Sequence, residues 1–267
     1  MNLYRLNVEE RTNIRSRIHA EIAERDSVFV SSIITDKFLL QPNKNSRILD
    51  FGCGQGEMAD YLDKLGFDAF GCDIHKNWDG DSATPKEHLA VIQMNPYRLP
   101  YPDNNFDLVF STSVLEHVQN PEDVFSEIHR VLKPGGISMH YFPAKFYLPA
   151  EPHILVPLVN FFWPNCPNWW IKFWVLLRAI RIKELRPYWK GMYEKYIDFA
   201  KHAIAYPTNG YYRRLSTRVF GNCHSLVDFY IERGSGGFAS LARKLGLRKS
   251  FGWISQNFRM NFIYQRK

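Results

Sequence analysis

The chain reads SRILDFGCGQG at residues 46–56. An apolar run ends at Asp50 and enters a loop with glycine at every second position, at Gly52, Gly54 and Gly56. The residues EMADYL that follow predict a helix directly behind this loop. Because glycine lacks a Cβ, the backbone can turn sharply here and lie against a ligand at the helix N-terminus. The pattern predicts a nucleoside-cofactor cradle, although tight strand-to-helix turns also use glycine for steric reasons alone.

A second strand follows at the distance that a βαβ unit requires. Residues 68–74 read DAFGCDI, and Asp73 lies 17 positions after Gly56. An acid about 20 residues beyond such a loop accepts hydrogen bonds from ribose hydroxyls. The alternative is a surface Asp that caps the following turn. The loop does not fit a dinucleotide, because G-x-G-x-x-G needs its third glycine one residue later, and no Gly-Lys-Ser/Thr follows as in a P-loop.

Two further motifs narrow the kind of protein. Residues 94–118 read MNPYRLPYPDNNFDLVFSTSVLEHV, and residues 127–136 read EIHRVLKPGG. Together with the glycine loop and Asp73, they resemble the class I S-adenosylmethionine-dependent methyltransferases. Within this class, the sequence is similar to the group with type 11 methyltransferase domains, which includes ubiquinone, menaquinone and small-molecule O-methyltransferases. The resemblance covers residues 45–143 and implies S-adenosyl-L-methionine as the cofactor.

The resemblance also implies which residues hold the cofactor. In such proteins the glycine loop wraps the methionine part, and the acid after the second strand holds the ribose. Asn95 stands where the family usually has Asp beside the adenine amino group, and its side-chain carbonyl keeps the acceptor. Ser111 stands after the fourth strand, where the backbone faces the amino-acid end. The full set expected at the cofactor is Asp50, Gly52, Cys53, Gly54, Gly56, Asp73, Ile74, Met94, Asn95 and Ser111.

Alternating strand and helix patterns over residues 46–143 predict an α/β core with a doubly wound, mostly parallel sheet of seven strands. Helical spacing predicts a leader of N-terminal helices, assigned to residues 1–45. Residues 235–267 are expected to complete the core sheet. They contain a helical pattern near 238–246 that ends at a glycine, and an alternating pattern near 258–264 that predicts an antiparallel edge strand.

Residues 144–234 form an insertion after the fifth strand, on the side where α/β sheets bind ligands. We expect an inserted helical cap that covers the acceptor site. Four tryptophans close to Lys and Arg residues also resemble an interfacial membrane helix, with aromatic rings at headgroup depth. They are Trp163, Trp169, Trp170 and Trp174. The alternative is that these aromatic residues pack on the leader helices.

Charge is distributed unevenly along the 267 residues, whose net charge is +7. Residues 1–171 carry 15 Lys and Arg against 22 Asp and Glu, whereas residues 172–267 carry 19 against 5. A strongly basic segment attracts an anionic substrate, an anionic membrane surface or nucleic acid, unless it is a solvated face without a partner.

The cysteines and the apolar runs of the sequence indicate the cellular compartment. The four cysteines show no metal-ligand spacing, so we expect reduced thiols and no metal site. The first residues lack the apolar core of a signal peptide. No apolar run is as long as the roughly 20 residues that a membrane-spanning helix needs. We therefore expect a cytoplasmic protein, with peripheral contact at the inner membrane face as an open alternative.

Histidines provide the candidate catalytic groups. Methyl transfer needs alignment, exclusion of water and, for a hydroxyl acceptor, removal of a proton, for which histidine is the usual base. His117 follows the fourth strand, and His153 lies at the entrance of the cap. We take both as catalytic candidates and expect His153 nearer the acceptor, because the cap must close over it.

The acceptor class follows from what the motifs lack. The basic tail raises the question of nucleic-acid methylation, but Asn-Pro-Tyr at residues 95–97 lies away from the end of the fourth strand, where the amino-methylating motif belongs. We expect O-methylation of a small-molecule, glycan or lipid-linked acceptor, for which an anionic group would suit the basic segment. C-methylation of a quinone-like ring and a cofactor-binding but catalytically silent partner subunit remain alternatives.

Overall fold

The computed structural model describes residues 26–267 except 77, 79–85 and 95. Within them, one seven-stranded sheet has the order β3-β2-β1-β6-β7-β9-β8. Its strands are β1 (Arg47–Phe51), β2 (Asp68–Asp73), β3 (Leu89–Val91), β6 (Phe106–Thr112), β7 (Leu132–Pro143), β8 (His224–Ser225) and β9 (Met260–Arg266). The first five in this order run parallel, and β9 pairs antiparallel with β7 and β8. The predicted mostly parallel α/β sheet is confirmed.

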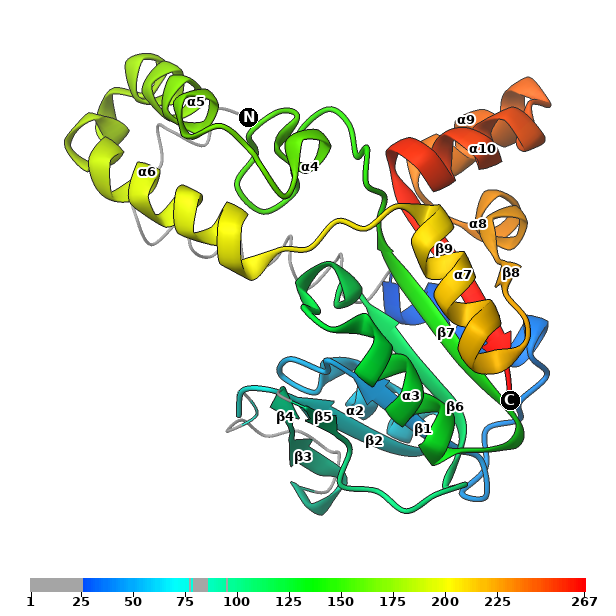
Figure 1. Cartoon of the computed structure of the whole chain (residues 1–267). Helices are drawn as coiled ribbons and strands as arrows, with labels where there is room; N and C mark the ends of the chain where they lie inside the picture. The colour runs from blue at the N-terminus through cyan, green and yellow to red at the C-terminus, as the bar shows by residue number, and fades with distance from the viewer. Residues whose placement is uncertain (1–25, 77, 79–85, 95) are drawn as a thin grey trace.

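Helices cover both faces of this sheet (Figure 1). Val109 of β6 faces one core with α3 (Pro121–Val131) and α7 (Asn209–Phe220). Its neighbours Leu108 and Phe110 face the other core, with α2 (Glu57–Lys64) and residues 30–38. Strands covered on both faces need apolar side chains at successive positions, and this explains the continuous apolar runs of the sequence.

The N-terminal helical prediction is partly described. Residues 26–32 are helical and continue into η2 (Ile33–Lys37), which packs against the sheet through Ile33 and Ile34. The prediction for residues 1–25 lies outside the described residues. Next to the sheet, β4 (Gln93–Met94) and β5 (Tyr97–Arg98) form a separate antiparallel hairpin. The other short helices of the core are η3 (Lys86–His88) and η4 (Leu115–His117).

The inserted helices stand away from the sheet (Figure 1). They are α4 (Val159–Phe162), α5 (Asn168–Arg181), η5 (Lys183–Tyr188), α6 (Trp189–Asp198) and η6 (Phe199–Ala203). They enclose a core of their own, whose most buried residues include Val159, Ile171, Val175 and Tyr206. Trp163, Trp170 and Trp174 pack against that core. The alternative, in which the tryptophans pack on the leader helices, involves residues 1–25 and lies outside the described residues.

The cap is shorter than the predicted 144–234. Helix α7 packs on the sheet through Tyr212 and Leu215, and α8 (Val227–Arg233) packs against β9 and the C-terminal helices. The segment apart from the sheet thus ends before Asn209. Helix α9 (Gly237–Leu245) ends at Gly246 with φ 68°, as predicted, and α10 (Arg248–Phe258) leads into β9. Within the described residues, no helix combines the length and the apolar character that crossing a bilayer requires.

Candidate active site

A cleft of about 220 Å³ opens where the parallel strands β1, β2 and β6 end. This is the edge at which open α/β sheets bind ligands. Its walls come from the end of β1, from the turn after β2, from the β4–β5 hairpin and from the loop after β6. The lining residues are Phe51, Gly52, Asp73, Ile74, His75, Ile92, Met94, Tyr97, Ser113, Val114, His117 and Val118.

The glycine loop begins at this cleft, which Gly52 lines. Gly52, Gly54 and Gly56 have φ angles of 80°, 54° and 83°, which are unfavourable for residues with a Cβ. A Cβ on Gly52 would lie 2.3 Å from Cγ2 of Val114, whereas a Cβ on Gly54 would meet no atom within 4 Å. Gly54 therefore borders open space that a ligand can enter.

Asp73 connects the second strand to this loop. Its Oδ2 accepts a hydrogen bond from the backbone N–H of Gly54 over 2.9 Å, and its Oδ1 accepts one from the N–H of His75 over 3.1 Å. Each carboxylate oxygen keeps further acceptor capacity. The carboxylate is thus held in a fixed position on the cleft wall, where it can accept hydrogen bonds from two neighbouring hydroxyls. The arrangement fits a ribose.

Asp50, at the end of β1, and Cys53, within the loop, do not line the cleft. Both are buried, and burial together with the charge of Asp73 raises the pKa of Asp50 to about 8. Burial also raises the pKa of the Cys53 and Cys72 thiols far above their usual value. These groups support the loop, and the predicted direct contact of Asp50 and Cys53 with the cofactor is not visible in the cleft lining.

At the other predicted positions the outcome is mixed. Ile74 and Met94 line the cleft, and Asn95 lies outside the described residues. Ser111 is not among the lining residues: it lies inside β6, fully buried, and its hydroxyl forms a 2.8 Å hydrogen bond with Nδ1 of His140. The strand continues one residue beyond it, so Ser113, with φ 55°, is the serine that reaches the cleft.

The two candidate histidines lie together although 36 residues separate them in the sequence. Their ring centroids are 4.8 Å apart. Nδ1 of His117 hydrogen-bonds the carbonyl of Ala203 over 2.6 Å, and burial lowers the pKa of His117 despite this bond. Nδ1 of His153 lies 2.6 Å from Oε1 of Glu151. Burial acts to lower the pKa of His153, but the hydrogen bond and the charge of Glu151 outweigh it and raise this pKa above its usual value.

Glu151 and Glu116 complete this group, and sequence reasoning missed both. Glu151 is fully buried and accepts hydrogen bonds from the N–H groups of His153 and Ile154 and from the hydroxyl of Tyr206. One ligand atom each of Glu116, His117 and His153 lies within 4.8 Å of the others, a group able to hold a metal ion. No spacing in the sequence indicates it, because the residues come from η4 and from the cap loop.

A larger hollow of about 500 Å³ lies between the core and the cap. Val118 lines both this hollow and the cleft, so the two meet beside η4. Its walls carry two cations, Lys145 and Arg214, and three aromatic rings, those of Trp163, Tyr206 and Tyr211. The Lys145 ammonium donates to the carbonyl of Trp163 over 2.9 Å, and burial lowers the pKa of Lys145.

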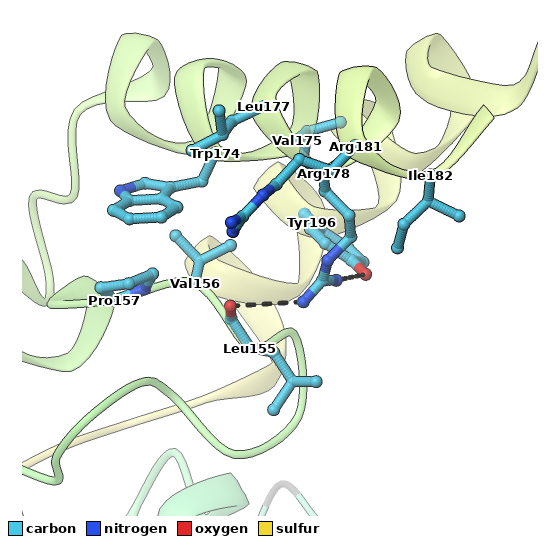
Figure 2. A pocket seen from close by; sticks show the side chains of 10 residues that line it. All are labelled: Leu155, Val156, Pro157, Trp174, Val175, Leu177, Arg178, Arg181, Ile182 and Tyr196. Carbon is cyan, nitrogen blue, oxygen red and sulfur yellow. Dashed lines mark hydrogen bonds between the residues drawn. The ribbon is translucent and has the colours of Figure 1, made fainter. Parts of the chain in front are cut away.

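The cap has a third hollow of about 230 Å³ between α5, α6 and the loop before α4 (Figure 2). Arg178 and Arg181 of α5 line it beside Trp174. The Arg178 guanidinium donates to the hydroxyl of Tyr196 over 3.0 Å and to the carbonyl of Leu155 over 3.4 Å (Figure 2). This hollow is remote from the glycine loop in sequence and shares no lining residue with the cleft.

Residues 49–139, about a third of the chain, match the family model described as a methyltransferase domain. A sterol 24-C-methyltransferase of Gibberella zeae is 37% identical over 98 residues, which cover 34% of this chain and 26% of that protein. A fatty-acid O-methyltransferase of Mycolicibacterium smegmatis is 34% identical over 119 residues, 43% of this chain and 40% of that protein. A ubiquinone biosynthesis O-methyltransferase of Roseobacter denitrificans is 31% identical over 109 residues, 37% of this chain and 42% of that protein.

The matches to these curated relatives thus span less than half the length of each. Among solved structures, an S-adenosylmethionine-dependent methyltransferase of Mesorhizobium loti has a TM-score of 0.50 at 14% identity, covering 88% of this chain and 97% of that one. This likeness concerns the fold. The family match, the glycine loop and the acid after the second strand agree, and residues 49–139 are therefore a methyltransferase domain of the class I, S-adenosylmethionine-dependent type.

Proposed function

We propose that the whole chain transfers the methyl group of S-adenosylmethionine to a hydroxyl of a small-molecule, glycan or lipid-linked acceptor that carries an anionic group. The cofactor would occupy the cleft, with its ribose on Asp73 and its remaining parts along Gly52, Ile74, Met94 and Ser113. The observation that carries the proposal is the hollow that meets this cleft at Val118, because it is large, partly aromatic and lined by two cations.

The cofactor supplies an electrophilic methyl group, so the protein must align the acceptor, exclude water and help its hydroxyl lose a proton. Lys145 and Arg214 would hold the anionic group, since charged hydrogen bonds fix orientation well. We propose His153 and His117 as the residues that act at the hydroxyl, because they lie where core and cap meet. Glu151 fixes the ring of His153.

The link between core and cap supports this role for the histidines. The backbone N–H of Ala205 donates to the carbonyl of Glu116, and Gln119 donates to the carbonyl of His202 over 3.2 Å. The segment that leaves the cap is therefore held against η4, next to His117. Any acceptor bound under the cap would be placed against the same loop that borders the cofactor cleft.

C-methylation of a quinone-like ring is the second candidate, because the relatives include a sterol 24-C-methyltransferase beside two O-methyltransferases. The test is a screen of anionic sugars, phenols, quinones and lipid-linked sugars with a cofactor whose methyl carbon is ¹³C. We expect a product whose labelled methyl group has the chemical shift of an O-methyl. A C-methyl shift would favour the second candidate. Cofactor binding without turnover of the cofactor, in the presence of every acceptor class, would favour a silent partner subunit.

We also propose peripheral association with anionic membranes through α5. Trp169, Phe173 and Ile180 are 67%, 51% and 64% exposed and recur at the spacing of one helix face. Lys172 and Arg181 on the same helix are exposed as well. Exposed aromatic residues with neighbouring cations suit the headgroup region of an anionic bilayer. The arginine-lined hollow of Figure 2 lies on this helix and could receive a headgroup phosphate.

A further inference from the structure

Glu116 of η4 carries a buried carboxylate without a compensating partner. The residue is 1% exposed, and neither Oε1 nor Oε2 has a hydrogen-bond partner among the described residues. A buried carboxylate is expensive unless it is paired or coordinates a metal. Among the described residues, the carboxylate of Glu116 therefore has no hydrogen-bonded partner.

The two histidines beside Glu116 each have one ring nitrogen already engaged. Nδ1 of His117 must be protonated, because it can only donate to the carbonyl of Ala203. Nδ1 of His153 likewise faces the Oε1 atom of Glu151. In the neutral rings, with both Nδ1 atoms acting as donors, both Nε2 atoms carry a lone pair for another partner. A histidine that ligates a metal through one nitrogen usually donates from the other to a carboxylate or a backbone carbonyl, as both do here.

We propose that Glu116, His117 and His153 bind a divalent transition-metal cation of the zinc type. Two imidazoles and one carboxylate are the protein ligands of a common class of zinc site that keeps its remaining position open. Imidazole favours such ions over magnesium or calcium. One ligand atom of each residue, a ring nitrogen for each histidine, lies within 4.8 Å of the others. Tetrahedral bonds of about 2.0–2.2 Å place ligand atoms about 3.4 Å apart, so the widest pair has to close by up to about 1.4 Å. The side chain of His153 is 32% exposed, which leaves an entry path.

The position of the site gives the cation a role that rests on the proposed function. His117 is part of the wall of the cofactor cleft, and the neighbouring Val118 also borders the hollow assigned to the acceptor. A cation held here would lie between cofactor and acceptor, with an open position for the acceptor oxygen. Because a bound cation lowers the pKa of an oxygen that it coordinates, the two histidines would act on the hydroxyl through the metal.

Metal binding can be measured without any acceptor. The purified full chain is stripped with a chelator, loaded with Zn²⁺, desalted and analysed for metal, and Co²⁺ is titrated while visible absorption is recorded. We expect about one equivalent of zinc, as for a single protein site, together with cobalt ligand-field bands. Zinc should also raise the Tm of the stripped protein. Glu116→Gln and His153→Ala should lose the zinc, the bands and the rise in Tm.

Two controls keep the test decisive. His202→Ala removes an exposed histidine beside the cap link and should bind zinc like the wild type. Glu116→Gln removes a buried charge, so its Tm in chelator should equal or exceed that of the stripped wild type, which shows that it folds. The proposal is overturned if the stripped wild type takes up no zinc, if Glu116→Gln binds as much as the wild type, or if His202→Ala binds none. Calorimetry on the stripped protein measures binding of S-adenosylmethionine, which the proposed function requires with or without the metal. A protein that binds the cofactor but no zinc would contradict the metal site alone, so the two failures are distinguishable.

Discussion

Gly52 and Val114 are packed so closely that a Cβ on the glycine would lie 2.3 Å from Cγ2 of the valine. The contact joins the end of β1 to the loop after β6, and both residues line the cleft. Gly52→Ala should therefore disturb both stability and cofactor binding. The positive φ of 80° contributes about 1–3 kcal/mol of strain for a residue with a side chain, and the overlap adds to it. Denaturant unfolding and calorimetry with S-adenosylmethionine measure the two effects.

The double variant Gly52→Ala with Val114→Ala separates the two causes of this loss. It removes the overlap with the two Cγ atoms of Val114, but it keeps a 3.1 Å contact with the Cβ of residue 114 and the backbone strain, so stability should recover only in part. Full recovery, or a single variant with wild-type stability, would show that the glycine is not required by its conformation.

His140 should make the protein sensitive to acid. It is fully buried, with both ring nitrogens hydrogen-bonded to the hydroxyls of Ser111 and Ser138, and burial lowers its pKa to about 3 from 6.5. Between pH 6.5 and 3 the unfolded chain binds a proton at this histidine that the folded chain does not. The contribution of His140 to stability is therefore present above pH 6.5 and is lost as the pH falls, by at most about 1.4 kcal/mol per unit.

His140→Gln is the matching variant for that measurement. Burial and the charge of Asp73 raise the pKa of Asp50 to about 8, so Asp50 makes the free energy of unfolding rise as the pH falls. This contribution is the same in both proteins and cancels in the comparison. The free energy of unfolding of the wild type, measured relative to that of His140→Gln, should fall as the pH is lowered from 6.5 to 5. Parallel curves would contradict a buried neutral histidine.

Much of the cofactor cleft was predictable because its parts are local. The glycine loop follows one strand, and Asp73 follows the next at a fixed interval, so the strand pattern alone places them at one edge of the sheet. The exact end of a strand was not predictable from the apolar pattern. Because β6 includes Thr112, the serine at the cleft is Ser113 and not Ser111.

The group around His153 was only half predictable. Both histidines were candidates on chemical grounds, but Glu116 was not, since a buried carboxylate cannot be told from a solvated one by sequence alone. Its surroundings are set by long-range contacts, such as that of Ala203 with His117 across 86 positions. The length of the cap was overestimated for the same reason. The pattern of α7 is amphipathic, and only the folded chain shows that its apolar face meets the sheet through Tyr212 and Leu215.

His153→Ala should lower turnover by a factor of about 10²–10⁴, the range that general acid–base groups contribute. His117→Ala should have a smaller effect, because we place His153 nearer the acceptor. The affinity for S-adenosylmethionine should remain within a few-fold in His153→Ala, since this residue does not line the cleft. Steady-state kinetics with an acceptor that the screen shows to be methylated decides which histidine contributes more to turnover. Near-normal turnover in His153→Ala with a tenfold loss in His117→Ala would reverse it.

Membrane association should depend on the exposed face of α5. The full chain should sediment with anionic vesicles at low salt and less at high salt, because basic residues near an anionic surface contribute about 1 kcal/mol each and are screened by ions. Trp169→Ala with Phe173→Ala should reduce binding several-fold. Trp253→Ala, which removes a tryptophan of α10 that is 62% exposed, is the matched control and should bind like the wild type. Absence of binding at low salt would leave α5 as part of the acceptor cap only.

The central claim is that the cleft beside Asp73 holds S-adenosylmethionine, and calorimetry of Asp73→Ala tests it most directly. The carboxylate is fixed by the N–H groups of Gly54 and His75, and we propose that it accepts hydrogen bonds from both ribose hydroxyls. Its loss should weaken cofactor binding by about 1.5–3 kcal/mol, the range for hydrogen bonds to a charged group, which is a factor of about 10 to 150 in Kd. Asp60→Ala, on the outer helix α2, should leave Kd unchanged. An Asp73→Ala protein that is folded and binds S-adenosylmethionine with the wild-type Kd would contradict the account.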